Sequence, residues 1–482
     1  MKTQLFQLLI RVCVWKGEFS DAIEEKQGIK QGETSCYKAG KNHLLNKLDI
    51  SPSLHIGSIS AGALMVADDL AIASRNPHDM QAALYTAEMD ASRERYKFNT
   101  DKTKTLAINY KQQPTLILNN KPLTISSKEV HLGIHRTSDG KNKATIEDRI
   151  NSARNACYAM RDAGLHGLNG AGPEIAMAQY AHYVLPTLLY GLEALVIKGD
   201  CLEELEKYHR KNLRYIQHLP QSTATPAIYL LLGALPIEAH LDIRTLTLYR
   251  SIISHKQNNP PADYIREIIY RQLITTSDDS SSWTRHVAHI LAKYNLPSAY
   301  QMFVDPPKKA AWKRTVDRVV KQEWTRRLQG DAELKPSLEY LNPSSCHLGH
   351  THRIWKHINC DLDIKKATVK ASFPTSGNKS ELCPLCKTEN ETTTHFLLHC
   401  PSTRQARLPY LKQIFLTCQN SKITIEPSEI TQLILDPTEL MDVDKEELEK
   451  LTRNMVFKLH HKRGLLLGGG SAYSCKGLAR IS

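Results

Sequence analysis

Residues 65–74 have the sequence MVADDLAIAS, in which two adjacent aspartates, Asp68 and Asp69, separate two apolar runs. Two short apolar runs joined by a turn-forming pair are typical of a β-hairpin, so we predict strands over residues 63–67 and 70–74. The two carboxylates at the tip have two interpretations. They form a solvated turn, in which aspartate is common, or they hold Mg²⁺, which prefers carboxylate oxygens as protein ligands.

The segments around this hairpin predict a mixed α and β unit. Asn76 and Pro77 form a helix-start signal, because asparagine caps helices and proline fits the first turn. Apolar residues then repeat at helical spacing from Met80 to Ala91, which predicts a helix that ends near Tyr96. Further strand-like segments lie at residues 54–59, 105–110, 114–120 and 130–135.

From about Ile146 onward the pattern is helical. The polar stretch SDGKNK, beginning at Ser138, predicts a domain boundary near residues 140–145. A later helix is predicted over residues 309–329 by one apolar stripe, formed by Trp312, Val316, Val319, Val320, Trp324 and Leu328. The rest of that helix is basic, and its outer face is either simply solvated or contacts phosphates.

The composition indicates a globular protein with several domains. The chain has 482 residues, of which 41% are hydrophobic and 23% charged, and its net charge of +13 favours polyanions such as nucleic acid as partners. Eleven cysteines, an odd and scattered set, favour a reducing intracellular compartment, nuclear or cytoplasmic, over a disulfide framework. No apolar run is long enough to predict a membrane span, and Gln7 and Arg11 interrupt the only run resembling a signal peptide.

Four metal-ligand residues have the spacing C-x2-C-x8-H-x4-C, and they are Cys383, Cys386, His395 and Cys400. Three thiolates and one imidazole make one tetrahedral Zn²⁺ site. His399 is an adjacent alternative ligand, but the spacing favours His395. A second stretch with two cysteines and four histidines, residues 345–360, has a spacing that fits no usual metal site, and we expect its histidines to be scattered over helix and loop.

Several short motifs occur in an order that resembles the reverse transcriptase of non-LTR (LINE-like) retrotransposons. These motifs are QGIKQG with Gly28, Gln31 and Gly32, VADD with Asp68 and Asp69, FNTDKT with Asn99, Lys102 and Thr103, HLGIH with Leu132 and Gly133, and LLYGLEAL over residues 188–195. The Cys-Cys-His-Cys pattern is also similar to the zinc knuckle that follows the thumb in this family. Each motif alone is weak, and their order carries the resemblance.

The resemblance implies roles for individual residues. Asp68 and Asp69 would bind Mg²⁺ in a polymerase palm, where two metal ions support phosphoryl transfer. Gly28, Gln31 and Gly32 would lie beside the template and the incoming nucleotide, with Lys102 near its phosphates. Leu132 and Gly133 would belong to the strand that grips the primer end.

A third catalytic carboxylate of that family lies in an Asp-x-x-x-Ala-Phe/Tyr-Asp block well before the glycine block. No residue before Gly28 matches it, because the acids there, Glu18, Asp21, Glu24 and Glu25, lie in the polar segment KGEFSDAIEEK. Electrostatic catalysis depends on pre-organised ligands, so we expect the chain not to polymerise by itself. A non-catalytic RNA- or DNA-binding protein, acting through the knuckle and the basic helices, is the alternative, and a helical scaffold is a third possibility.

The resemblance also implies an α+β organisation with Mg²⁺ and Zn²⁺ as cofactors, RNA and DNA as partners, and no membrane contact, while the oligomeric state stays open. The expected parts are a partial polymerase palm (1–142), a helical thumb and connection (143–275), a basic helical region (283–380), a CCHC zinc knuckle (381–402) and a helical C-terminal tail (403–482).

Overall fold

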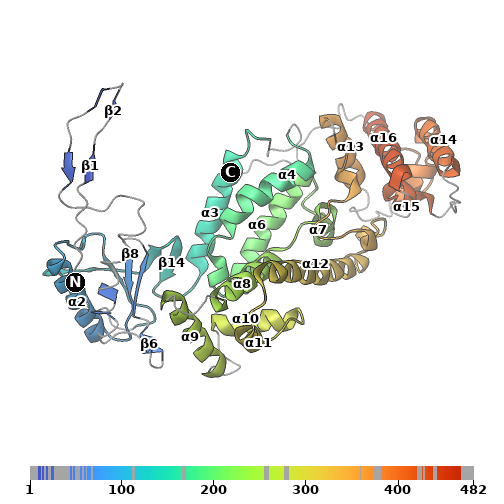
Figure 1. Cartoon of the computed structure of the whole chain (residues 1–482). Helices are drawn as coiled ribbons and strands as arrows, with labels where there is room; N and C mark the ends of the chain where they lie inside the picture. Colours follow the sequence, from blue (N-terminus) through green and yellow to red (C-terminus); the bar gives the residue numbers. More distant parts are fainter. Residues whose placement is uncertain are drawn as a thin grey trace. The chain divides into compact units, whose positions relative to one another are not determined.

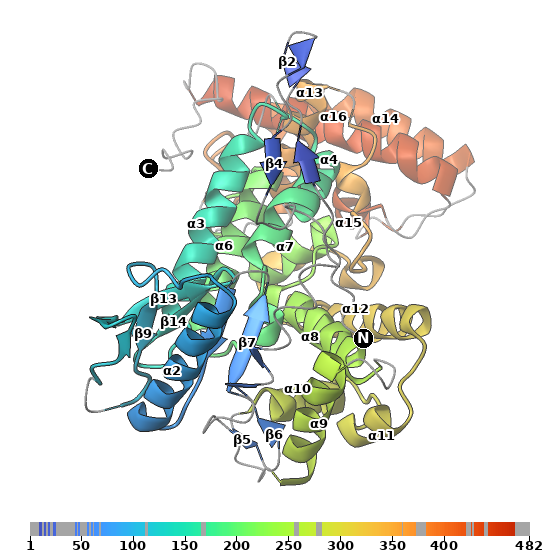
Figure 2. The same cartoon turned by 60° about the vertical axis from the view of Figure 1, so that its left-hand side comes forward.

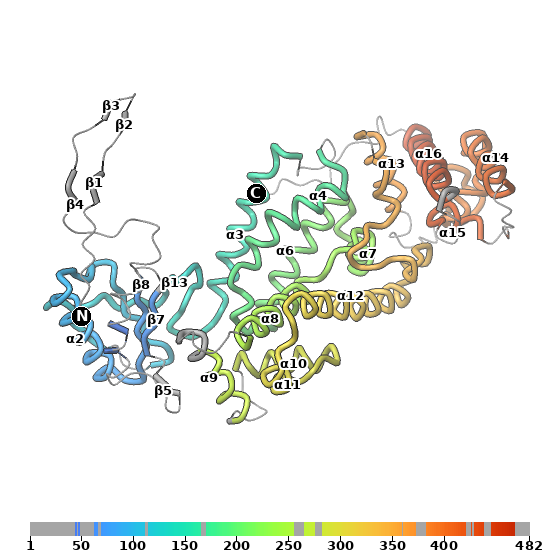
Figure 3. Tube along the Cα trace, viewed as in Figure 1, coloured from blue at the N-terminus to red at the C-terminus, as the bar shows by residue number. Residues whose placement is uncertain are grey.

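The structure is a computed structural model. It describes short pieces between residues 9 and 60, and then residues 62–66, 69–110, 114–164, 170–254, 260–275, 282–358, 360–372, 382–420, 426, 429–437 and 442–467 (Figures 1 and 3). The chain divides into two units, an N-terminal unit of residues 1–129 and 137–140 and a C-terminal unit of residues 130–136 and 141–482. The N-terminal unit is mixed α and β, and the C-terminal unit is helical.

The described strands pair two by two. The antiparallel pairs are β1 (Leu9–Arg11) with β4 (Ile23–Glu25), β2 (Val14–Trp15) with β3 (Glu18–Phe19), β5 (His55–Ile56) with β6 (Ile59–Ser60), β7 (Ala63–Val66) with β8 (Asp69–Ile72), and β10 (Ile117–Leu118) with β11 (Lys121–Pro122). β9 (Lys104–Leu106) pairs in parallel with β12 (Thr124–Ser126), and β13 (Lys128–His131) pairs with β14 (Ile134–Thr137). Glu24 and Glu25 therefore lie on a strand paired with β1, in a different sheet from the aspartate hairpin.

The predicted hairpin around the aspartates is confirmed. β7 and β8 pair in antiparallel register, with Met65 opposite Leu70 and Val66 opposite Asp69. Met65 and Leu70 pack against a small core that includes Ala83 and Ala87. The hairpin is thus fixed by a helix that follows it in the sequence.

That helix is α2 (Pro77–Arg93), and its predicted start is confirmed. The Asn76 side chain accepts a hydrogen bond from the backbone N–H of Asp79, which satisfies a donor of the first helical turn. Leu84, the residue after Ala83, points to a different side of the helix and packs with Leu116 and Leu118 in a second small core. α2 therefore joins the hairpin to the strands that follow it.

The prediction of one strand over residues 130–135 is wrong. Leu132 (φ 51°) and Gly133 (φ 77°) form the turn between β13 and β14, so the segment is itself a hairpin. Two consecutive residues with positive φ are typical of the tightest hairpin turns, and leucine rarely adopts this conformation. The apolar pattern conceals the turn because Leu132 stands where glycine or asparagine usually signals one.

The C-terminal unit is a chain of helices. They are α3 (Lys143–Ala159), α4 (Pro173–Gln179), the π-helix η1 (Tyr180–Val184), α5 (Leu185–Leu188), η2 (Leu192–Ala194), α6 (Asp200–Gln217), α7 (Thr225–Leu232), α8 (Ile237–Ile253), α9 (Pro260–Thr275), α10 (Trp283–Lys293), α11 (Ala299–Val304), α12 (Lys309–Glu333), η3 (Pro336–Leu338), η4 (Pro343–Ser345), η5 (Arg353–Trp355), α13 (Asp361–Ser372), η6 (His395–His399), η7 (Pro401–Thr403), α14 (Arg404–Asn420), α15 (Ile430–Leu435) and α16 (Asp442–Leu466).

One large core runs from α3 to α13, and α7 is buried almost throughout. Helices α3, α6 and α7 lie side by side in Figures 1 and 2. The predicted apolar stripe of α12 is confirmed, because Trp312, Val316, Val320 and Leu328 are buried in this core. Among the described residues no single helix is long and apolar enough to cross a membrane. The bent pair of α7 and α8 together reaches the required length and apolar composition.

The motif LLYGLEAL packs against the β13–β14 turn. A Cβ atom added to Gly191 would lie 2.5 Å from the Ile134 side chain, and one added to Gly133 would lie 3.0 Å from the ring of Tyr190. Glu193, in the same motif, makes two hydrogen bonds to the guanidinium of Arg244 on α8, at 3.1 and 3.2 Å. Two motifs that are more than fifty residues apart therefore form one packed contact.

The histidine-rich stretch lies across the end of α7. Gly233, which has a positive φ of 64°, ends this helix, and its carbonyl oxygen accepts a hydrogen bond of 2.7 Å from the backbone N–H of Gly349. His352 donates its backbone N–H to the carbonyl of Leu231 at 2.9 Å, and its side chain is buried. His352 thus holds the loop on α7 through its backbone, and its ring lies 3.4 Å from the carboxylate of Asp436.

A second core holds α14, α15 and α16 together. Between it and α13 lies a buried charged group in which Lys370 Nζ contacts Glu449 Oε2 at 2.7 Å and Thr452 Oγ1 at 2.8 Å. Arg453 donates to the other oxygen of Glu449 at 3.1 Å. These paired charges tie α13 to α16, because removing one partner would leave another charge buried and uncompensated.

Replacing Gly233 with alanine is expected to lower the free energy of unfolding by about 3 kcal/mol, from positive-φ strain and overpacking together. The added Cβ atom would lie 2.4 to 2.7 Å from backbone atoms of His350, which cannot move aside like a side-chain end. Gly330→Ala is the control, since that helical glycine has nothing within 4 Å, and it should stabilise by about 0.5–1 kcal/mol. Denaturant unfolding measures both changes, and a Gly233→Ala variant as stable as the native chain would refute this account of the loop.

Candidate functional site

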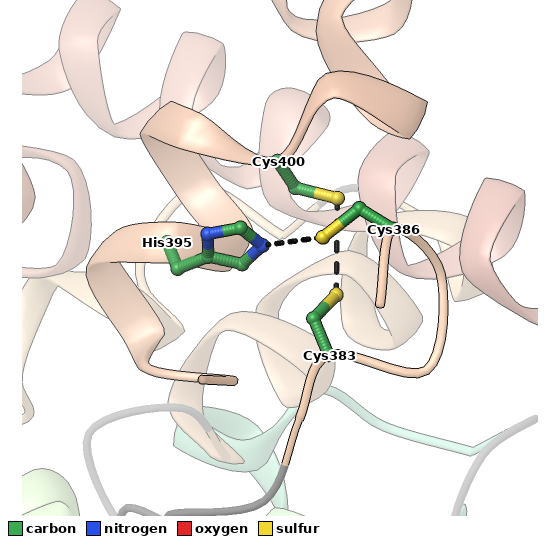
Figure 4. Close-up of side chains that lie close together, drawn as sticks. All are labelled: Cys383, Cys386, His395 and Cys400. Atoms are coloured by element: carbon green, nitrogen blue, oxygen red, sulfur yellow. Dashed lines mark hydrogen bonds between the residues drawn. The ribbon is translucent and has the colours of Figure 1, made fainter. Parts of the chain in front are cut away.

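Four predicted metal ligands converge in the C-terminal unit. The donor atoms of Cys383, Cys386, His395 and Cys400 all lie within 4.8 Å of one another (Figure 4). The sulfurs of Cys383 and Cys400 are 3.9 Å apart, and Cys386 Sγ lies 3.3 Å from His395 Nε2. Metal–sulfur bonds of about 2.3 Å in a tetrahedron place two sulfurs about 3.8 Å apart. The cluster can therefore hold a metal ion such as zinc.

A tight turn brings the first two ligands together. The backbone N–H of Lys387 donates to the carbonyl of Cys383 at 2.8 Å, and Lys387 has a positive φ of 56°. The N–H of Cys383 donates in turn to the carbonyl of Glu389 at 2.8 Å. The residues that follow the second ligand, 387–390, are exposed.

The other two ligands come from the two ends of a short π-helix. In η6 the N–H of Cys400 donates to the carbonyl of His395 at 2.7 Å, five residues earlier. This wide turn aligns the two side chains toward the same point, and single π-turns are frequent at functional sites. His399 is exposed and lies outside the cluster, so the structure selects His395, as the spacing favours.

The cluster is attached to the second hydrophobic core. Phe396 and Leu397, which directly follow the ligand His395, are buried in this core with residues of α14 and α16. The buried guanidinium of Arg407 on α14 donates to the carbonyl oxygen of Cys400 at 2.6 Å. Packing and hydrogen bonding therefore both fix the ligand-bearing backbone.

Neighbouring polar groups prepare the ligands for a cation. The Thr388 hydroxyl donates to Cys386 Sγ at 3.1 Å, and together with the Thr388 N–H it lowers the pKa of Cys386 to about 6. Burial raises the pKa of Cys383. His395 Nδ1 lies 2.8 Å from Glu389 Oε2, so it carries the ring proton and leaves Nε2 as the electron-pair donor.

Sequence reasoning missed three supporting residues, Thr388, Glu389 and Arg407. Thr388 and Glu389 lie in the eight-residue loop between Cys386 and His395, whose composition is simply polar. A carboxylate near a ligand histidine is a usual partner. Nothing in the spacing distinguishes Glu389 from Glu391, however, and Glu391 pairs with Arg463 on α16 instead.

The β7–β8 hairpin, which carries the predicted Mg²⁺ ligands, does not form a complete metal site among the described residues. Asp69 begins β8 with an exposed side chain, and Asp68 lies outside the described residues. Within the described part of the chain, Asp69 belongs to no group of three or more side chains that can hold a metal ion. The structure therefore gives no support to the predicted Mg²⁺ site.

The FNTDKT motif forms a turn after α2. The Asn99 side chain accepts hydrogen bonds from the backbone N–H groups of Asp101 and Lys102, at 3.0 and 3.1 Å. Thr103 Oγ1 donates to the Asn99 carbonyl at 2.8 Å, and the Lys102 side chain is exposed. The local role of Asn99 and Thr103 is thus to shape the turn that presents Lys102.

The glycine block with Gly28, Gln31 and Gly32 lies outside the described residues. The structure therefore leaves their predicted role beside the template and nucleotide as a prediction.

No model of a known protein family matches the chain, and no curated protein matches it at a significant level. The resemblance to non-LTR reverse transcriptases therefore stands on the short motifs and their order alone.

Replacing Glu389 with glutamine is expected to weaken metal binding about tenfold. Loss of the hydrogen-bond partner of a ligand histidine usually costs about 10- to 100-fold in metal affinity. We expect the lower value because the Glu389 side chain is 64% exposed. Glu391→Gln is the matched control, since it removes a carboxylate from the same loop. Competition between the protein and a chelator of known affinity measures the change. A Glu389→Gln variant that binds the metal as tightly as the native chain would show that Glu389 does not support His395.

Proposed function

We propose that the chain binds nucleic acid through a zinc-stabilised Cys3His module, and that it derives from the C-terminal portion of a non-LTR reverse transcriptase that does not polymerise by itself. The observation that carries the proposal is the convergence of Cys383, Cys386, His395 and Cys400 in a chain with a net charge of +13. Three thiolates and one imidazole are a zinc donor set.

The surface of the module offers polar groups to a ligand. Its metal ligands are buried or half-buried, whereas the turn formed by Lys387, Thr388, Glu389 and Asn390 is exposed. A module that fixes a short polar loop on a metal can present backbone and side-chain donors to phosphates and to unpaired bases. The metal has a structural role, because all four ligand positions are occupied by protein atoms.

A polymerase role within a longer chain is the second candidate. It is favoured by the β7–β8 hairpin, which places the exposed Asp69 beside its turn, and by the packing of Gly133 and Gly191 between two family motifs. The Asp-x-x-x-Ala-Phe/Tyr-Asp block has no counterpart before Gly28. Sequence added upstream would have to supply it.

The binding proposal predicts that the zinc-loaded chain binds single-stranded RNA with an affinity that falls steeply as salt rises, because phosphate contacts release counterions. Cys383→Ser should bind less tightly, since the module loses its metal. Cys360→Ser replaces an exposed cysteine outside the cluster and should change nothing. Fluorescence anisotropy over a salt series measures all three, and undetectable or salt-independent binding by the native chain would contradict the proposal.

The chain is expected to show no primer extension on an RNA template with Mg²⁺, because one of three catalytic carboxylates is missing and such losses typically cost orders of magnitude in rate. Product length on a denaturing gel is the measurement. Extension that Asp69→Asn abolishes, and that the remote control Asp331→Asn leaves intact, would overturn the expected inactivity and favour the polymerase role.

A further inference from the structure

The charge on α12 is distributed unevenly along the helix, and the first half carries most of the positive charge. Residues 308–321 hold six lysines and arginines and one acid, whereas residues 322–333 hold two arginines and three acids. Lys313, Arg314 and Arg318 are exposed, and none of them has an ion-pair or hydrogen-bond partner within the described part of the chain. The single acid of this half, Asp317, pairs with Lys321 at 2.8 Å.

The second half of α12 is neutralised internally. Arg326 makes two hydrogen bonds to Glu323, at 2.9 and 3.0 Å, and Arg327 donates to the same carboxylate at 2.7 Å. The guanidinium of Arg327 also lies over the Trp324 ring. The excess positive charge is therefore confined to one end of the helix.

Packing fixes the direction in which this basic end points. Trp312 is buried and its Nε1 donates to the carbonyl of Leu246 on α8 at 3.2 Å, while Val316 and Val320 are fully buried. Arg314 and Arg318 lie on the side of the helix opposite this stripe, and the exposed Lys313 lies on its flank. The helix cannot turn these cations inward without exposing its core stripe.

The spacing of the cations suits a regular polyanion. Lys309 and Lys313, like Arg314 and Arg318, are four residues apart, which corresponds to about 6 Å along a helix axis. Lys321 continues the face toward the exposed loop residues Gly349 and His350, because its side chain lies 3.4 to 3.6 Å from the position of a Cβ atom on Gly349. Arg314, Arg318 and Lys321 thus lie together on the outer side of one rigid helix, with Lys313 on its flank.

We infer that the outer side of α12, formed by Lys313, Arg314, Arg318 and Lys321, binds the phosphate backbone of a nucleic acid strand as a second contact beside the Cys3His module. The inference rests on the proposed function and names the surface that supplies its salt dependence. The tryptophans of α12 face inward, so the face offers charges and no aromatic stacking, and it binds without base preference.

The test uses the full zinc-loaded chain and a labelled 20-nucleotide single-stranded RNA of mixed sequence. The triple variant K313A/R314A/R318A should bind at least tenfold less tightly at low salt. The slope of log affinity against log salt should become shallower by about 2, since each single-strand phosphate contact contributes about 0.7. Circular dichroism and zinc content should match those of the native chain.

The matched control is R326A/R327A/K335A, which removes the same three charges from the neutralised end of the same region. This control should keep the native slope of log affinity against log salt. A separate variant, R314K/R318K, keeps the positive charges and should bind RNA as tightly as the native chain. If the native chain binds RNA with steep salt dependence and both triple variants behave alike, the α12 surface is wrong and the proposed function stands. If the native chain binds no RNA, the proposed function itself fails.

One further outcome identifies a different partner. Competition with poly-glutamate at equal charge concentration should displace RNA poorly, because a flexible acidic polypeptide does not match the fixed spacing of the cations on the helix. Equal displacement by poly-glutamate would overturn the assignment to nucleic acid and indicate an acidic protein segment as the occupant.

Discussion

The convergence of three thiols and one imidazole is the constraint on which the C-terminal third of the chain depends. In the described segment 382–403 the only strand-like pairing is a single bridge between Leu382 and Asn390. Fixing His395 also places Phe396 and Leu397 in the core with α14 and α16. The candidate metal ligands and the core residues Phe396 and Leu397 therefore lie in one short segment of the chain.

In the larger core, a loop is fixed by hydrogen bonds and packing without metal ligands. The loop over residues 346–355 is fixed on α7 through the backbone at Gly233, and on α6 through Trp355, whose Nε1 donates to Gln217 Oε1 at 3.1 Å. The same loop contacts α12, because the N–H of Leu348 donates to Thr325 Oγ1 at 3.2 Å. A histidine-rich segment that resembles a metal site in composition is thus a packing element, and it helps to fix the helix that carries the basic face.

The sequence predicts most accurately where periodicity and side-chain chemistry coincide. The aspartate hairpin, the Asn76 cap, the apolar stripe of α12 and the four metal-ligand residues all follow from local patterns of this kind. The β13–β14 turn was predicted as a strand because Leu132, an exposed leucine with a positive φ, gives no turn signal in the sequence. Glu389 and the buried Lys370–Glu449 pair could not be predicted, because each depends on elements that the fold alone brings together.

The central claim is that nucleic acid lies on the Cys3His module and on the first half of α12. Photo-crosslinking of a uridine-containing RNA to the native zinc-loaded chain, with the attachment sites mapped by mass spectrometry, tests this most directly. The account predicts crosslinked peptides from residues 382–403 and 308–321. Crosslinks confined to other segments, or none at salt concentrations where RNA is bound, would contradict it.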